Sequence, residues 1–314
     1  MDGILIIDKA AGMTSHDVVS RVRRVLGTKR VGHTGTLDPF ATGVMVILVG
    51  KATRLAQFLD KDTKEYIADL QFGFETDTGD ATGSRRPPQP RSAATPPETA
   101  GEPDGSRSEE LAAKLAATDW HSVFEKFRGE ILQTPPMYSA KKIEGKKLYE
   151  LARQGIEVER KPVKVIIQKL ELMRPEIRDP RSAIRIRVVC SAGTYIRTLA
   201  EGIGREVGLG AHLSALRRTA AGKFDLPQSL SLEQLESATV HKLLPIDAAV
   251  SHLAEFQMDA DRVEKTKSGL ATRADGDRFA PGQYIRMTDG EGNIIAIGIN
   301  DDDEKSIRPK VVLI

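Results

Sequence analysis

The segment Gly32–Gly43 constrains this chain most, because an irregular stretch runs directly into a strongly apolar one. Its three glycines and single proline are typical of a loop. The six residues that follow, Val44–Val49, are all apolar and predict a buried strand. One carboxylate, Asp38, stands in the loop, and Pro39 restricts its backbone. Such an acid either caps the loop by accepting backbone N–H bonds or takes part in chemistry.

The composition indicates an ordinary globular protein with enough material for one large domain and a small one. The 314 residues are 40% hydrophobic and 29% charged. The formal net charge is only +2, so total charge does not point to a nucleic acid. Basic side chains nevertheless gather at 21–30, 141–147 and 181–218. Such basic faces suit a polyanionic partner, although a solvated surface is the commoner explanation.

Several classes of site are absent from the sequence. The single cysteine, Cys190, excludes an internal disulfide framework and fits a reducing compartment. The histidines lack metal-ligand spacing, and no GxxxxGK[ST] loop occurs. No apolar stretch reaches membrane-spanning length, and the N-terminus has no basic flank or cleavage site. We therefore expect a cytoplasmic protein without a membrane segment, metal or cofactor.

Apolar periodicity predicts intermixed helices and strands. Ser15–Leu26 is amphipathic and predicts a helix with Ser15 as its N-cap. Lys64–Phe72 alternates as a strand with Tyr66 on its apolar face, and Thr194–Val207 predicts a later helix. Further strands are expected at 163–172 and 184–190. Without regular βαβ alternation, this order favours an α+β fold with a mixed, mainly antiparallel central sheet.

Two regions differ from the rest in composition. Residues 84–109 are rich in proline, serine and alanine with almost no large apolar side chain, which predicts a flexible surface insertion. From about residue 253, short strand-like pieces alternate with Gly and Asp turns. We therefore expect a large domain over 1–245 and a small all-β domain over 246–314.

Arg197 is the candidate cation for Asp38. It falls in the first turn of its predicted helix, beside the positive end of the dipole, where a cation is disfavoured. An i,i+4 pair with Glu201 is the structural alternative, but Arg before Glu is the weaker orientation. A nucleophilic carboxylate needs a neighbour that keeps it ionised. The sequence therefore favours a functional pairing of Arg197 with Asp38.

Separate motifs resemble those of the pseudouridine synthases, specifically the TruB-type bacterial tRNA pseudouridine-55 synthases. In chain order they are Asp8–Ser15, Gly32–Gly43, Lys64–Tyr66, Thr76–Asp80 and Cys190–Arg197. The match covers roughly residues 1–223, interrupted by the insertion. Two positions depart from the family pattern: Ala10 stands where Pro is usual, and Phe40 where Leu is commoner. Neither departure removes a reactive group.

The resemblance implies isomerisation of a uridine in RNA, without a cofactor. Asp38 would be the nucleophile, attacking either the uracil ring or ribose C1′. Arg197 would orient Asp38 and keep it ionised, and Tyr66 would support the base from below. His33 would occupy the space left by the flipped base. Without the resemblance, Tyr66 reads as a core residue and His33 as a surface one.

The resemblance also implies supporting residues and partners. Asp80 would support the Arg197 end of the site, although an Asx turn is an equal alternative. Tyr195 and the segment Leu216–Arg218 would supply further wall and backbone contacts, and Lys9 belongs to the first motif. The implied fold is a pseudouridine-synthase-like catalytic domain followed by a PUA-like RNA-binding domain. The implied partner is the T-loop of tRNA, with a monomeric protein and no protein partner.

Two other function classes stand beside the isomerase. The protein could act mainly as an RNA chaperone that opens and re-forms the tRNA elbow, with isomerisation secondary or absent. A hydrolase that uses Asp38 to cleave a glycosidic bond is disfavoured, because it would normally want a second carboxylate as its acid.

Overall fold

The computed structural model describes residues 1–59, 62–86, 105–143, 145–173, 182–239, 243–273, 279–301 and 303–313. Its strands are β1 Gly3–Lys9, β2 Val31–Thr34, β3 Thr42–Val49, β4 Lys64–Phe72, β5 Glu75–Thr76, β6 Arg85–Arg86, β7 Gly129–Gln133, β8 Lys142–Ile143, β9 Lys146–Lys147, β10 Val163–Met173, β11 Ala183–Cys190, β12 Ala211–Ala221, β13 Phe224–Asp225, β14 Ala254–Gln257, β15 Thr272–Arg273, β16 Tyr284–Thr288, β17 Ile294–Asp301 and β18 Ser306–Val312. Its α-helices are α1 Ser15–Val25, α2 Ala56–Leu59, α3 Gly105–Ala117, α4 Trp120–Glu125, α5 Leu148–Arg153, α6 Ile196–Val207, α7 Leu232–Ser237 and α8 Ala260–Lys267, and its 3-10 turns are η1 Gly50–Leu55, η2 Leu226–Gln228 and η3 Ile246–Ala249.

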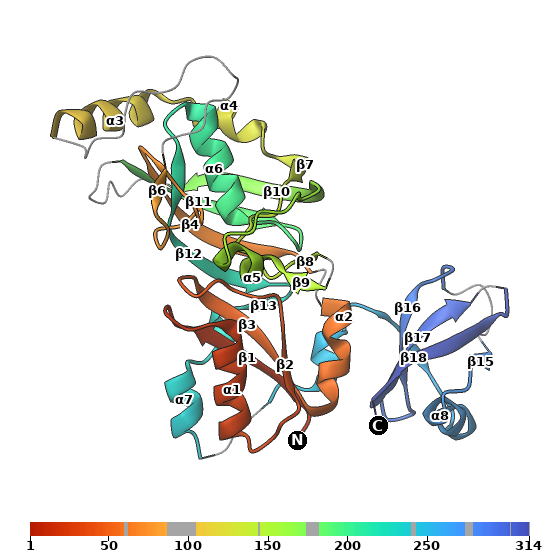
Figure 1. The fold of residues 1–314 in the computed structure, drawn as a ribbon. Coiled ribbons are helices and arrows are strands. Elements are labelled where there is room, and N and C mark those ends of the chain that lie inside the picture. The colour runs from red at the N-terminus through yellow and green to blue at the C-terminus, as the bar shows by residue number, and fades with distance from the viewer. Residues whose placement is uncertain are drawn as a thin grey trace.

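A nine-stranded sheet forms the centre of the molecule (Figure 1). Its main path runs β1-β3-β12-β4-β11-β10-β7, with β2 paired to β3 and β13 paired to β12. Strands β3 and β12 run parallel, and the other pairs in this sheet are antiparallel. The expected mixed, mainly antiparallel sheet is therefore confirmed.

The apolar run Val44–Val49 lies in β3, which is buried on both faces of the sheet. Met45 and Ile47 belong to one hydrophobic core, while Val46 and Leu48 belong to a second. Because successive side chains of a strand point to opposite faces, a strand between two cores must be apolar throughout. This double burial explains why the run is continuous rather than alternating.

Strand β4 shows the alternation expected from the sequence. Tyr66, Ala68, Leu70 and Phe72 are buried, while the residues between them are half-buried. The buried face packs in the same core as Leu199 and other apolar residues of α6, and Figure 1 shows that helix lying along the sheet. One end of this packed layer carries the candidate site.

The C-terminal residues form a separate five-stranded sheet, in the order β14-β16-β17-β18-β15. This mainly β unit, which also contains helix α8, is consistent with a PUA-like domain. Ile297, Val311 and Leu313 share the second hydrophobic core with Ile4 and Leu55, so the small sheet packs against the N-terminal part of the chain. The boundary at 245/246 stays a prediction. Within the described parts of the chain, no helix has the length and apolarity needed to span a membrane.

Four local expectations differ from the structure. Thr14, rather than Ser15, is the N-cap of α1, and its side chain accepts from Asp17 N–H in a capping box. Strand β2 takes the start of the expected loop, so the loop itself covers 35–41. Helix α3 begins at Gly105, inside the expected insertion, whose residues 87–104 lie outside the described chain. Strand β12 was not expected from the sequence.

Strand β12 was missed because its sequence, AHLSALRRTAA, lacks a strand pattern. Alanine is depleted in strands, and the strand contains only two large apolar residues, Leu213 and Leu216. It forms because β4 and β3 offer it hydrogen-bonding partners on both sides. Tertiary pairing therefore overrides local propensity at the centre of the sheet.

Candidate active site

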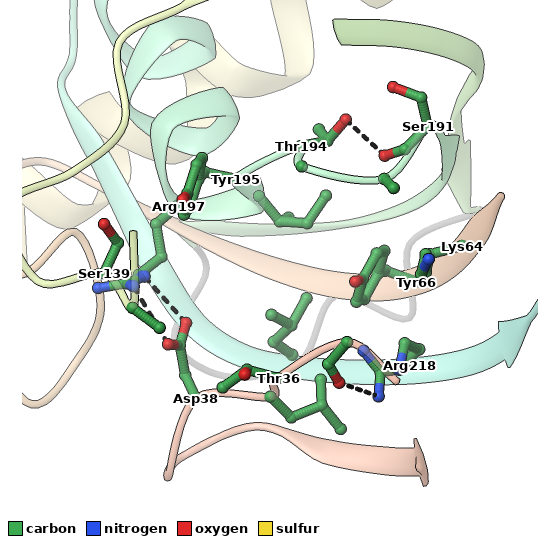
Figure 2. Close-up of a pocket in the computed structure, with 17 residues that line it drawn as sticks. Thr36, Asp38, Lys64, Tyr66, Ser139, Ser191, Thr194, Tyr195, Arg197 and Arg218 are labelled. Carbon is green, nitrogen blue, oxygen red and sulfur yellow. Dashed lines mark hydrogen bonds and ion pairs between the residues drawn. The ribbon is translucent and has the colours of Figure 1, made fainter. Parts of the chain in front are cut away.

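The principal pocket lies between the Asp38 loop, the start of β4, the N-terminus of α6 and β12 (Figure 2). It encloses about 270 Å³. Five of the eight residues proposed from the sequence line it: Asp38, Tyr66, Tyr195, Arg197 and Leu216. They come from four separate segments, which the fold brings together.

Asp38 and Arg197 form a two-pronged ion pair. The Arg197 Nε lies 3.0 Å from Asp38 Oδ2, and Nη2 donates to Oδ1 at 3.1 Å. Such parallel contacts fix the plane of the carboxylate as well as its charge. The Asp38 side chain is 32% exposed whereas that of Arg197 is 5% exposed, so the carboxylate reaches the pocket and the guanidinium stays behind it. This is the pairing expected from the sequence.

Two backbone carbonyls and a second carboxylate surround the rest of the Arg197 guanidinium. Its Nη1 donates to the Thr78 carbonyl at 2.9 Å, and its Nη2 donates to the Tyr138 carbonyl at 2.7 Å. The Asp80 Oδ2 lies 3.7 Å from Nη1, and the Asp80 side chain is buried. Asp80 is therefore placed behind Arg197, outside the pocket lining, as the resemblance implies. These contacts explain how the first turn of α6 tolerates a buried cation.

The N-terminal motif holds the two residues that flank Asp38. The Ser15 hydroxyl accepts from Leu37 N–H at 2.9 Å and donates to the Leu37 carbonyl at 3.1 Å. On the other side, the Pro39 carbonyl accepts from Gly12 N–H at 2.9 Å and from Lys9 Nζ at 3.2 Å. Asp38 therefore sits on a backbone clamped from both directions.

Lys9 lies outside the pocket lining. It is completely buried, and its Nζ also donates to the carbonyls of Ala10 and Met13. The structure thus gives it a role in holding the Asp38 loop rather than in contacting substrate. Burial lowers the pKa of Lys9 to about 8, and the charge of Asp38 opposes this shift.

His33 also lies outside the pocket lining. It stands on β2, opposite Ile47 of β3, and is half-buried. The sequence analysis placed it in the loop, but pairing with β3 extends the strand through it. Its role in base flipping stays a prediction.

Tyr66 and Leu216 form part of the apolar wall, and both are less than one-tenth exposed. Burial raises the pKa of the Tyr66 hydroxyl, so it stays protonated at neutral pH.

Tyr195 precedes α6, and its backbone N–H and C=O are both bound by the Gln133 side chain, at 2.9 and 3.3 Å. Gln133 therefore fixes the backbone of the N-cap residue of α6, whose own side chain makes no capping hydrogen bond.

Electrostatics divide the site into a carboxylate end and a cationic end. Burial raises the pKa of Asp38 above its ordinary value, and the charge of Asp80 adds to this shift. The Arg197 guanidinium opposes both and favours the ionised carboxylate. At the other end, Lys64 and Arg218 line the pocket beside Tyr66 (Figure 2).

Sequence reasoning missed several contributors to the site. Pocket-lining residues absent from the expected contacts include Thr36, Lys64, Ser139 and Ser191. Gln133 carried no signal, because a lone glutamine near a Pro-rich turn matches no motif. Arg218 is next but one to Leu216, yet only recognition of β12 as a strand would have placed both side chains on the same face.

The TruB family pseudouridylate synthase N-terminal domain matches residues 23–95 and 91–196. The tRNA pseudouridylate synthase B C-terminal domain matches residues 197–251. Curated relatives named tRNA pseudouridine synthase B include one from Geobacillus thermodenitrificans, 44% identical over 87% of this chain and 86% of the relative. Another, from Solibacter usitatus, is 41% identical over 95% of each chain.

Solved structures extend the similarity to the fold. A chain from the crystal structure of a Cbf5-Nop10-Gar1 complex matches this chain with a TM-score of 0.68 and 24% sequence identity, and the match covers 99% of this chain and 85% of that one. A chain from an H/ACA RNP bound to a substrate RNA containing 2'-deoxyuridine has a TM-score of 0.66 and 22% identity, with the same coverage. At such identities these structures support the fold alone. The family matches together span more than half of the sequence, and so this chain belongs to the TruB family of pseudouridylate synthases and is an enzyme of that class.

Proposed function

We propose that this enzyme converts uridine 55 in the T-loop of tRNA to pseudouridine, with Asp38 as its nucleophile. The observation that carries the proposal is the Asp38–Arg197 pair, in which a partly exposed carboxylate is oriented by a buried guanidinium at 3.0 Å. The relatives' names supply tRNA as the substrate class. A tRNA substrate also fits the cytoplasmic location and the basic segments expected from the sequence.

The reaction needs no outside group. The C1′–N1 bond breaks, the uracil rotates, a C1′–C5 bond forms, and the proton lost from C5 is balanced by one gained at N1. Asp38 attacks either the uracil ring or ribose C1′, and both routes require it to be ionised. Arg197 provides that condition, and Tyr66 supports the base from the pocket wall.

The target uridine must leave its stack before it reaches Asp38. Extrusion of a base costs a few kcal/mol, which contacts inside the pocket must offset. Tyr66, Tyr195 and Leu216 supply an apolar and aromatic lining suited to a flipped base. We propose that His33, on the strand leading into the Asp38 loop, occupies the vacated position in the RNA.

The test is conversion of an unmodified tRNA transcript by the wild type and by Asp38→Asn, with the product mapped to its nucleotide. The wild type should convert the T-loop uridine, and the variant should bind the tRNA without converting it. Asn keeps the size of the side chain and loses its charge, so a loss of at least about 1,000-fold in rate is expected for a nucleophile.

Other outcomes would contradict the proposal. Conversion at a different nucleotide would reject the T-loop assignment. Conversion by Asp38→Asn at the wild-type rate would reject the nucleophile. Equal refolding of tRNA by both proteins, with conversion by neither, would favour the chaperone function.

A further inference from the structure

Arg218 is among the most deeply buried large side chains of the described chain, at 1% exposure, and it lines the pocket. Its guanidinium is held by backbone carbonyls: Nε donates to Val44 at 2.7 Å and Nη2 donates to Gly35 at 3.0 Å. Within the described residues, no carboxylate forms an ion pair with it; Asp38, the carboxylate that lines the pocket, is paired with Arg197 instead.

A buried cation without a carboxylate partner is costly. Removing an ion from water costs several kcal/mol even after the protein relaxes, and carbonyl dipoles recover only part of that cost. A neutral donor such as glutamine could satisfy a carbonyl without this penalty. Hydrogen bonding to the carbonyls of Val44 and Gly35 therefore explains why position 218 carries a hydrogen-bond donor, but it does not explain why that donor is positively charged.

The surroundings increase the excess of positive charge. Lys9, also fully buried, is bound only to carbonyls, and the charge of Arg218 contributes to lowering its pKa. Lys64 is buried at the same end of the pocket. Of the three arginine and lysine side chains that line the pocket, Lys64 and Arg218 lie beside Tyr66, away from the Asp38–Arg197 pair (Figure 2).

Arg218 lies beside the position that a flipped base would occupy. It is the cross-strand partner of Tyr66 in the β12–β4 register, and Figure 2 shows its guanidinium near the Tyr66 ring and across the pocket from Asp38. Directly opposed residues have their Cβ atoms about 5 Å apart, which keeps the two side chains adjacent. A uracil resting on Tyr66 with its sugar near Asp38 would therefore have Arg218 beside the ring.

We propose that Arg218 is a further catalytic residue, which stabilises the negative charge that develops on the uracil during the reaction. This inference rests on the proposed function. If Asp38 attacks C1′, the C1′–N1 electron pair leaves with the uracil. If Asp38 adds to the ring, the electron pair of the ring double bond moves toward a carbonyl oxygen. Both routes place negative charge on the base, and Arg218 offsets it without forming or breaking a bond.

The test compares Arg218→Met and Arg218→Lys in single-turnover conversion of tRNA, with tRNA affinity measured separately. Met keeps the length and loses the charge, and should lower kcat about 100-fold, which is typical for loss of one electrostatic contact in a transition state. Lys keeps the charge and should stay within about tenfold of the wild type. The Kd for tRNA should change little in both. Arg185→Met is the matched control, since Arg185 pairs with Asp69 on the other face of β4.

A second measurement depends only on the lysine variant folding. A lysine at this buried position loses its proton at a lower pH than an ordinary one, whereas arginine stays charged. The ratio of Arg218→Lys kcat to wild-type kcat should therefore fall as pH rises. A purely structural role predicts a ratio independent of pH.

The outcomes are distinct. A slow Met variant, an active Lys variant and a pH-dependent ratio support the inference. Equal losses in the folded Met and Lys variants, a Met variant at the wild-type rate, or a flat ratio would overturn it. If the Met variant does not fold, the ratio decides. Failure of the wild type to convert any tRNA uridine would instead reject the proposed function.

Discussion

The Ser15 hydroxyl binds both backbone groups of Leu37. It accepts a hydrogen bond from the Leu37 N–H at 2.9 Å and donates one to the Leu37 carbonyl at 3.1 Å. Ser15 begins α1, and Leu37 immediately precedes Asp38. A buried hydroxyl on a helix thereby sets the position of the Asp38 loop. We predict that the first motif of the sequence affects the reaction through this backbone contact rather than through contact with substrate.

Ser15→Ala should therefore weaken both the fold and the reaction. It leaves the buried N–H and C=O of Leu37 without their partner, at a cost of about 1–3 kcal/mol in the free energy of unfolding. A small displacement of Asp38 should lower kcat about tenfold or more. Denaturant unfolding and single-turnover rates measure the two effects. Ser229→Ala, which loses a hydroxyl bond to Leu226 in η2, should leave kcat unchanged.

Gln133→Leu should lower kcat with little change in tRNA affinity. Its amide binds the N–H and the carbonyl of Tyr195, two residues before Arg197, so its loss frees the start of α6. The expected fall in kcat is about tenfold, since misplacement of a catalytic group is costly even over a small distance. Gln71→Leu removes comparable bonds to Ser182 in the sheet and should affect stability alone. Equal kcat for both variants would count against this role.

Asp80→Asn should move the acid side of the pH–rate profile to lower pH. If Asp38 is the nucleophile, it must be ionised, so the rate should fall as pH drops through the pKa of Asp38, which burial raises. The charge of Asp80 contributes to that rise, and its removal lowers the pKa of Asp38. Asp69→Asn, on the opposite face of β4, should leave the profile in place. A shift of the Asp80→Asn profile to higher pH would contradict the electrostatic reading.

Lys9 should make the free energy of unfolding rise with pH in mildly alkaline solution. Its pKa is about 8 in the folded protein and 10.5 for an ordinary lysine, so the folded state binds fewer protons between these values. By linkage, the wild type should gain stability relative to Lys9→Met as pH increases from about 8 to 10, by at most about 3 kcal/mol. Denaturant unfolding of both proteins at several pH values measures the difference. A constant difference would show that Lys9 titrates normally.

Much of the architecture was predictable from local pattern. The alternation of Lys64–Phe72 and the apolar run Val44–Val49 identify their strands because burial on one or both faces dictates side-chain period. The helix beginning near Arg197 follows equally from its apolar stripe. Strand β12 was not predictable in this way, because pairing with β3 and β4 rather than propensity stabilises it.

The sequence by itself indicated the candidate cation, because an arginine in the first turn of a helix is locally disfavoured. The candidate nucleophile came from the resemblance of the Asp38 loop to that of the pseudouridine synthases. Only the tertiary structure decided which other side chains surround them. In the structure, Lys9 and His33 lie outside the pocket lining. Gln133 binds the residue that precedes α6, and Arg218 lies opposite Tyr66 in the strand register. Strand register and burial make those assignments, and both depend on contacts between residues far apart in the chain.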